Sequence, residues 1–136
     1  KMDVYISGPS ACTADDTEQW VYDSLGRIHS KAAMGQCLTG NEGSAKVTLT
    51  DCVANNAAQV WSMDATTSAI KQSGQCLDLN SGNLVNNRQI AIRYSCSGNN
   101  NQRWTMLNQN TSLILAGATS RNIDILVKNL KTQSLN

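Results

Sequence analysis

Three tryptophans, each closing a triplet of similar pattern, constrain the fold of this chain more than any other feature. Trp20, Trp61 and Trp104 are the only tryptophans among 136 residues, and 41 and then 43 positions separate them. A glutamine stands two positions before Trp61 and Trp104, and Glu18 takes that place before Trp20. A regular period near 40 residues indicates an internal repeat, with several secondary-structure elements in each copy.

The repeats share more than their tryptophans. In the second repeat Cys37-Leu38 precedes an apolar–polar alternation that ends at Cys52, and in the third Cys76-Leu77 precedes a similar run that ends at Cys96. We expect each Cys-Leu pair to begin a strand, and each alternating run to form a half-buried strand. One such unit cannot bury its apolar face alone, so the copies must share a core. The sequence therefore predicts an all-β fold.

We expect one domain over residues 1–136. The repeats span about 1–34, 35–73 and 74–107, and a degenerate tail covers 108–136. The first copy is eroded, because Met2-Asp3-Val4 stands in the Cys-Leu-Asp place. Phenylalanine is absent and Pro9 is the only proline, whereas Asn, Ser, Gly and Thr are abundant, which is typical of short strands joined by polar turns.

Composition excludes several classes of function. Charged residues make up 15% of the chain and the net charge is +1, so a basic nucleic-acid-binding surface is not expected. The apolar runs are far shorter than the roughly 18 residues that suggest a membrane span, so direct membrane insertion is not expected either. No Cys-x-x-Cys motif occurs and His29 is the only histidine, so we expect no metal and no cofactor.

The sequence gives little support for an enzyme. Asp15, Asp16 and Asp64 could serve as paired acids, but they stand in polar segments without an apolar cleft. His29 with Cys12 would make a thiol dyad that no further residue supports. We interpret His29 as a solvated residue at a strand end, and we expect no catalytic activity.

The Gln-x-Trp triplets and the cysteine spacing, repeating in register, resemble the ricin B-type lectins. This Gln-x-Trp family of β-trefoils includes the galactose-binding B chains of two-chain plant toxins and modules attached to bacterial glycosidases. The resemblance covers most of residues 1–104. It implies a β-trefoil with three repeats around a pseudo-threefold axis and the three tryptophans in its core.

The resemblance also implies a sugar site in the third repeat. The family places an acidic residue after Cys-Leu, an aromatic residue two positions before the second cysteine, and an asparagine before the glutamine of Gln-x-Trp. A carboxylate can accept from two adjacent hydroxyls, and an aromatic ring can pack on the apolar face of galactose. We therefore expect galactose or N-acetylgalactosamine, within larger glycans, to bind in a shallow pocket formed by the following residues: Asp78, Ile92, Tyr94, Asn101 and Gln102.

The other repeats lack this set. The second has Thr39 in the acidic place, Thr50 in the aromatic place and Ala58 in the asparagine place, whereas the first keeps Asp3 as a weaker second candidate. Two alternatives stay open. The chain could be a carbohydrate-binding module or toxin B-chain fragment that targets a catalytic or toxin partner, or a protease-inhibitor-type trefoil without a sugar site.

Matching positions of four cysteines in two repeats indicate the disulfides Cys37–Cys52 and Cys76–Cys96. Cys12 is then unpaired within the chain: it is a free buried thiol, or it bonds to another segment or chain. Disulfides imply an oxidising compartment, so we expect a secreted, extracellular or vacuolar protein. Asn110 begins an Asn-Thr-Ser sequon and is a candidate N-glycosylation site.

Overall fold

The chain folds into short β-strands in a computed structural model, which describes residues 2–7, 19–40, 45–64, 66–79, 90–92, 95–109, 112–117 and 129–132. In β1 only the side chain of Val4 is described, and in β9 to β12 only that of Trp104. The side chain of Asn100 is not described, and those of all other residues in these ranges are. The elements are β1 (Met2–Ser7), β2 (Trp20–Tyr22), β3 (Ile28–Ser30), β4 (Ala33–Thr39), β5 (Thr48–Asp51), the 3₁₀ helix η2 (Ala57–Gln59), β6 (Ser62–Asp64), β7 (Ala69–Gln72), β8 (Gln75–Leu79), β9 (Ile90–Ile92), the 3₁₀ helix η4 (Asn100–Gln102), β10 (Trp104–Gln109), β11 (Ser112–Gly117) and β12 (Asn129–Thr132).

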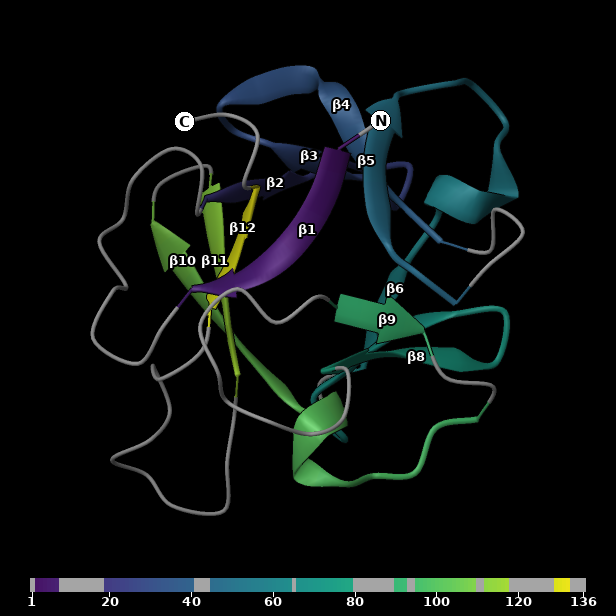
Figure 1. Cartoon of the computed structure of the whole chain (residues 1–136), viewed down its shortest axis with the longest axis vertical. Helices are drawn as coiled ribbons and strands as arrows, with labels where there is room; N and C mark the ends of the chain where they lie inside the picture. The colour runs from purple at the N-terminus through teal and green to yellow at the C-terminus, as the bar shows by residue number, and fades with distance from the viewer. Residues whose placement is uncertain are drawn as a thin grey trace.

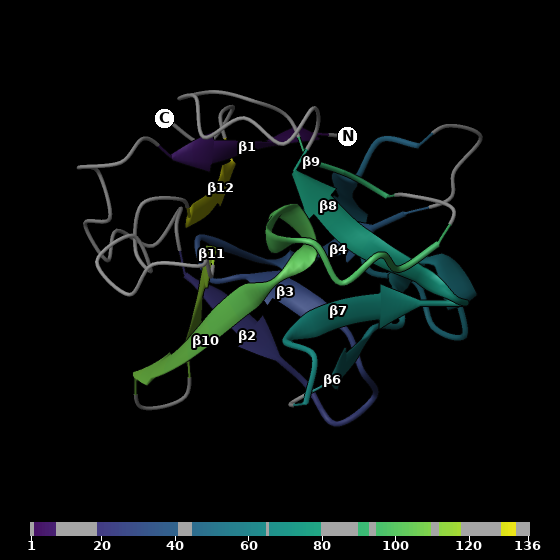
Figure 2. The ribbon, with the colours of Figure 1, turned by 90° about the horizontal axis from the view of Figure 1, so that it is seen from below.

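Eight strands form a sheet in the order β10-β11-β12-β1-β5-β4-β3-β2, and β11 also pairs with β2. The additional pairing, Leu113 with Trp20, closes the seven strands from β11 to β2 into a ring, and β10 pairs with β11 outside that ring. Four further strands form a second sheet in the order β6-β7-β8-β9. Figure 1 shows β1 beside β5 and β12, and in Figure 2 the strands β6 to β8 lie on the opposite side of the molecule from β10 and β11.

The core lies where the repeats meet. Trp20, Trp61 and Trp104 are 0%, 2% and 1% exposed, which confirms that all three are core residues. Burial of large aromatic side chains contributes much of the stability of a small all-β domain. Their buried neighbours are aliphatic: Val4, Ile28, Leu38, Val47, Leu49, Ile70, Leu77 and Leu79.

One prediction about strand position is wrong in the second repeat. Cys76 and Leu77 lie near the start of β8, as expected, but Cys37 and Leu38 lie near the end of β4. The cause is the pairing of β4 with β3, which extends β4 back to Ala33, with a register shift between His29 and Ser30. Such an irregularity inserts residues that a simple alternation pattern does not reveal.

The described part of the chain contains no helix with the length and apolar character that crossing a bilayer needs.

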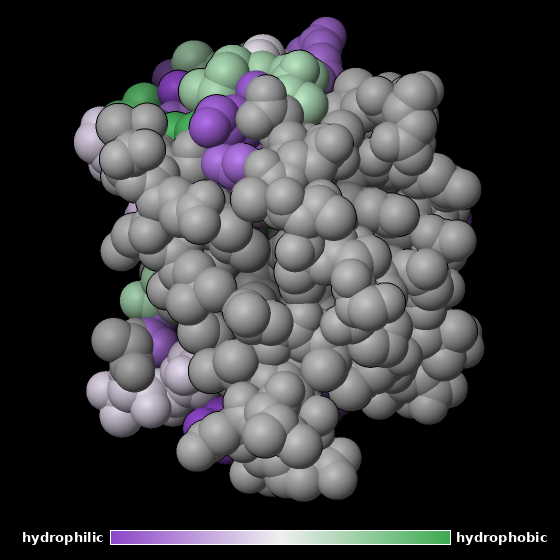
Figure 3. Space-filling model, turned by 90° about the vertical axis from the view of Figure 1, so that its left-hand side faces the viewer, coloured by the Kyte–Doolittle hydropathy of each residue, from purple (hydrophilic) through white to green (hydrophobic). Residues whose placement is uncertain are grey.

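On the face shown in Figure 3, the described residues form small hydrophilic and hydrophobic areas side by side. Among the described side chains, the large exposed hydrophobic residues are Tyr22, Leu25, Met34, Val53 and Val60.

Candidate functional site

The tryptophan of each Gln-x-Trp triplet is tied to the Cys-Leu strand of its own repeat. The indole Nε1 of Trp61 donates to the carbonyl oxygen of Leu38 at 2.9 Å, and that of Trp104 donates to Leu77 at 3.0 Å. A buried indole N–H needs an acceptor, and the residue after Cys supplies one in both repeats. These tryptophans therefore position the residue that follows each leucine, Thr39 or Asp78.

The glutamine of the second repeat completes a closed set of hydrogen bonds. Gln59 is fully buried, and its Nε2 donates to the Thr39 and Thr50 hydroxyls at 3.1 Å each and to the Asp51 carbonyl at 2.8 Å. Its Oε1 accepts from the Val53 backbone N–H at 2.9 Å. The two threonine hydroxyls also lie 2.7 Å from each other. The hydroxyls of Thr39 and Thr50 therefore have their hydrogen-bond partners within the repeat.

The glutamine of the third repeat makes the same backbone contacts but faces a carboxylate. Gln102 accepts from the Ser97 N–H at 2.7 Å and lies 3.4 Å from the Ser95 carbonyl, the equivalents of Val53 and Asp51. Its Nε2 donates to Asp78 Oδ2 at 2.8 Å. Asp78 therefore takes the place of Thr39, as the sequence alignment of the repeats predicts.

Asp78 also accepts a hydrogen bond from Asn101. The Asn101 Nδ2 lies 3.1 Å from Asp78 Oδ2, so two side-chain amides from η4 converge on one carboxylate oxygen of β8. Amide donors to an ionised carboxylate give charge-assisted bonds that fix its orientation. Asp78 is 1% exposed, a degree of burial that the sequence did not predict. The structure thus brings together three of the five predicted site residues: Asp78, Asn101 and Gln102.

The remaining predicted residues cannot be placed at the site. The side chains of Ile92 in β9 and Asp3 in β1 lie outside the described residues, although the backbone of each is described. Tyr94, Cys12 and Asn110 lie outside them entirely. Backbone pairing sets Leu77 opposite Ile92 and Asp78 opposite Ala91, so β9 runs directly beside the candidate site.

Both predicted disulfides are present. Cys37 is bonded to Cys52 and Cys76 to Cys96, with sulfur–sulfur distances of 2.01 and 1.99 Å. Two disulfides fit an oxidising compartment. His29, Cys37 and Cys52 each bring one potential metal-ligand atom within 4.8 Å of the others. Both sulfurs are held in the disulfide, so they are not available as the thiolates that a metal needs.

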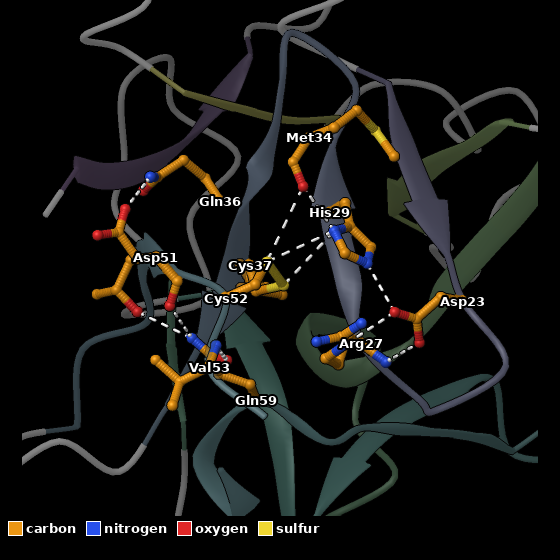
Figure 4. Close-up of a disulfide and its surroundings, with 12 residues drawn as sticks. Asp23, Arg27, His29, Met34, Gln36, Cys37, Asp51, Cys52, Val53 and Gln59 are labelled. Atoms are coloured by element: carbon orange, nitrogen blue, oxygen red, sulfur yellow. Dashed lines mark hydrogen bonds and ion pairs between the residues drawn. A yellow bond between two sulfur atoms is a disulfide. The ribbon is translucent and has the colours of Figure 1, made fainter. Parts of the chain in front are cut away.

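Sequence reasoning missed a polar cluster beside the Cys37–Cys52 disulfide (Figure 4). Asp23 Oδ2 lies 2.7 Å from His29 Nε2 and accepts from Arg27 Nε at 2.8 Å, while His29 Nδ1 lies 2.8 Å from the Met34 carbonyl. The interpretation of His29 as a solvated strand-end residue is therefore wrong, because its whole residue is 9% exposed. One signal could have revealed the cluster: an aspartate follows the tryptophan by three positions at Asp23 and again at Asp64.

The charge of Asp23 is stabilised by folding. Burial raises its pKa, but hydrogen bonds from His29, Arg27 and the Leu25 N–H outweigh burial and hold the pKa well below its ordinary value of 3.8. Asp64 has a lowered pKa too, chiefly through the Thr67 N–H, with Lys71 contributing. The carboxylates three residues after Trp20 and Trp61 therefore each stabilise the turn that follows them.

Asp23→Asn is expected to lower the free energy of unfolding by about 1 kcal/mol at pH 7, because the amide keeps the turn but loses charge-assisted bonds. Folding lowers the Asp23 pKa, so its charge adds stability above 3.8 and that stability is lost as the pH falls below this value. The difference in free energy of unfolding between the parent and the variant should therefore be largest at pH 7 and smaller at pH 3. Urea unfolding of the parent and of Asp23→Asn at both pH values measures this difference in stability, and a difference that is larger at pH 3 than at pH 7 would contradict the prediction.

The fold and site define a class. A closed sheet, a second four-stranded sheet and three buried tryptophans, two of them bonded to the Cys-Leu strand of their own repeat, are features of a β-trefoil built from Gln-x-Trp repeats. The family model described as "Ricin-type beta-trefoil lectin domain" matches residues 8–116. The chain therefore belongs to this family, whose members are carbohydrate-binding, non-catalytic domains.

Two solved structures are similar to the chain. One is a non-toxic homologue of type II RIPs from Momordica charantia (bitter gourd) in complex with α-methyl-D-galactoside, at 18% identity and a TM-score of 0.46; the match covers 84% of this chain and 61% of that one. The other is the β-trefoil lectin of the Vibrio vulnificus hemolysin/cytolysin with N-acetyl-D-lactosamine bound, at 15% identity and a TM-score of 0.46, covering 97% and 85%. The comparison with curated protein sequences gave no match.

Proposed function

We propose that the chain is a lectin domain that binds galactose or N-acetylgalactosamine residues of glycans at Asp78. The observation that carries this proposal is the convergence of Asn101 and Gln102 on the Asp78 carboxylate. A carboxylate offers about four acceptor positions, so Asp78 can accept from sugar hydroxyls in addition to these amides. Asn101, half-buried at the edge of this set, can donate and accept at a neighbouring hydroxyl.

The second repeat supports the assignment by contrast. Thr39 and Thr50 stand where the third repeat has Asp78 and Tyr94, and their hydroxyls bond to Gln59 and to each other. Thr39, in the place of Asp78, has no carboxylate that could hold two hydroxyls at once. We therefore assign sugar binding to the third repeat, with Ile92 and Tyr94 forming the apolar side of the site and Asp3 marking a weaker second site.

The burial of Asp78 has a consequence for affinity. Because this carboxylate is 1% exposed, a sugar can reach it only when the covering atoms move aside. The free energy of that opening is subtracted from the intrinsic binding free energy. We therefore expect a monosaccharide dissociation constant of about 1 mM, or about −4 kcal/mol.

Weak single sites act together in natural lectins when they are linked. Joining two sites raises the apparent affinity through effective concentration, without any new contact. We propose that this chain works secreted, outside the reducing cytosol, as the glycan-targeting part of an assembly with further sites or with a catalytic or toxin partner. The two disulfides support that location.

Asp78→Asn is expected to weaken galactose binding about 10- to 100-fold, because a hydrogen bond to a charged group contributes roughly 1.5–3 kcal/mol. Calorimetric titration with methyl galactoside measures the loss, and circular dichroism confirms that the variant is folded. Thr39→Ala, at the equivalent place of the second repeat, is the matched control and should keep the parent affinity. A folded Asp78→Asn variant with parent affinity would place the site elsewhere; a parent chain without sugar binding would refute the proposal.

A further inference from the structure

The Cys37–Cys52 disulfide and the Cys76–Cys96 disulfide occupy equivalent places but have different surroundings. His29 and Lys71 stand directly opposite Cys37 and Cys76 across their strand pairs. The Lys71 Nζ is bonded to Asp64 at 3.2 Å. The His29 Nδ1 instead lies 3.6 Å from Cys37 Sγ and 3.5 Å from Cys52 Sγ, against both atoms of the disulfide (Figure 4).

The two partners of His29 suit a ring that carries a hydrogen on each nitrogen. Nδ1 lies 2.8 Å from the Met34 carbonyl oxygen, and Nε2 lies 2.7 Å from the carboxylate of Asp23. A carbonyl and a carboxylate both accept hydrogen bonds, so the protonated ring can donate from each nitrogen at once. In that form the positive charge of the imidazolium lies beside both sulfurs. Arg27, bonded to the same carboxylate oxygen, holds Asp23 in place.

A positive charge beside a disulfide favours thiol–disulfide exchange there. Exchange speeds up when the leaving sulfur is stabilised as a thiolate, and a neighbouring imidazolium stabilises a thiolate. Cys37 is fully buried whereas Cys52 is partly exposed, so an external thiol reaches Cys52 first. Attack at Cys52 makes Cys37 the leaving sulfur, 3.6 Å from the imidazolium.

We propose that Cys52 is a modification site for low-molecular-mass thiols of the glutathione class, with His29 assisting the exchange. The attacking thiolate forms a bond to Cys52 Sγ while the Cys37–Cys52 bond breaks, and the electron pair of that bond passes to Cys37 Sγ. The Cys37 thiolate then takes a proton from His29 Nδ1. The step makes one mixed disulfide and one thiol, with no net oxidation. A second thiol molecule attacks the mixed disulfide and completes the reduction.

Exposure alone predicts the opposite order of reactivity. Cys76 is as buried as Cys37, but Cys96 is exposed whereas Cys52 is only partly so. If access governed the rates, the Cys76–Cys96 disulfide would react first. The proposal requires the Cys37–Cys52 disulfide to react first, so the two disulfides of one chain provide an internal comparison.

The test is timed exposure of the folded chain to reduced glutathione, followed by acid trapping, alkylation and peptide mapping. We expect the Cys37–Cys52 disulfide to open about tenfold faster than Cys76–Cys96, with glutathione found on Cys52. The difference should disappear in denaturant, where the surroundings of both disulfides are lost.

The variant His29→Gln distinguishes between two roles for His29: assisting the exchange reaction, or only supporting the local structure. We expect this variant to lose most of the excess rate at Cys37–Cys52 and to keep the parent rate at Cys76–Cys96, whereas Lys71→Gln should leave the Cys37–Cys52 rate unchanged. A structural role for His29 predicts faster opening in His29→Gln, through local loosening. Faster or unchanged opening in that variant, equal rates for the two disulfides in the folded parent, or glutathione on Cys37 would each overturn the proposal.

Discussion

Trp61→Ala is expected to lower the free energy of unfolding by about 3–5 kcal/mol, the usual range for deleting a buried tryptophan side chain. Trp61 is 2% exposed and packs in the shared core, so the vacated volume borders more than one repeat. The change also removes the indole donor to the Leu38 carbonyl. Urea unfolding followed by circular dichroism measures the loss.

Val60→Ala is the matched control for this change. Val60 is the neighbour of Trp61 in the chain but is 45% exposed, so its truncation should cost less than about 1 kcal/mol. If Trp61→Ala cost no more than Val60→Ala, the tryptophans would not be the elements that hold the repeats together. The burial of these tryptophans would then contribute little to the free energy of unfolding.

Gln59→Ala is the second change with a large expected effect, about 2–4 kcal/mol of stability. It leaves the Val53 N–H and the Asp51 carbonyl, two part-buried groups, without the partner that Gln59 provides, and it removes the bonds of Gln59 to both threonine hydroxyls; a group left unsatisfied costs up to about 1–3 kcal/mol. The Thr39 and Thr50 hydroxyls keep each other as partners, which limits the loss. Urea unfolding measures the change, and sugar affinity should stay at the parent value.

Gln102→Ala is the matched variant in the third repeat. It removes the same kind of backbone contacts, at Ser97 and Ser95, and also the donor to Asp78. We therefore expect a loss of stability together with a loss of sugar affinity. If both glutamine variants kept full affinity, Gln102 would be a structural residue only, and the candidate site would lose one of its members.

The sequence predicted the features that repeat in register. The core tryptophans, both disulfides and the exchange of Thr39 for Asp78 follow from aligning one repeat on another. Closure of the sheet did not follow, because it depends on β11 pairing with both β2 and β12, strands that are far apart in the chain. The contact of His29 with the disulfide also escaped prediction, since it depends on a register shift between His29 and Ser30.

For the candidate site, the residue types were predictable and their burial was not. Alignment places Asp78, Asn101 and Gln102 at equivalent positions of a repeat, but the exposure of a carboxylate depends on what covers it in three dimensions. The family resemblance implied a shallow pocket at the surface, whereas Asp78 is 1% exposed in the structure. That difference makes opening of the site part of the proposed binding reaction.

The central claim, that Asp78 with Asn101 and Gln102 forms the galactose site, is tested most directly by following amide signals during a sugar titration. In ¹H–¹⁵N NMR spectra with methyl galactoside, the side-chain amides of Asn101 and Gln102 should shift progressively, because both donate to the carboxylate that the sugar engages. The side-chain amide of Gln59, at the equivalent place of the second repeat, should stay unchanged, and methyl mannoside should move none of the three. Shifts at Gln59 with Asn101 and Gln102 unmoved, or no saturable shifts at all, would contradict the assignment.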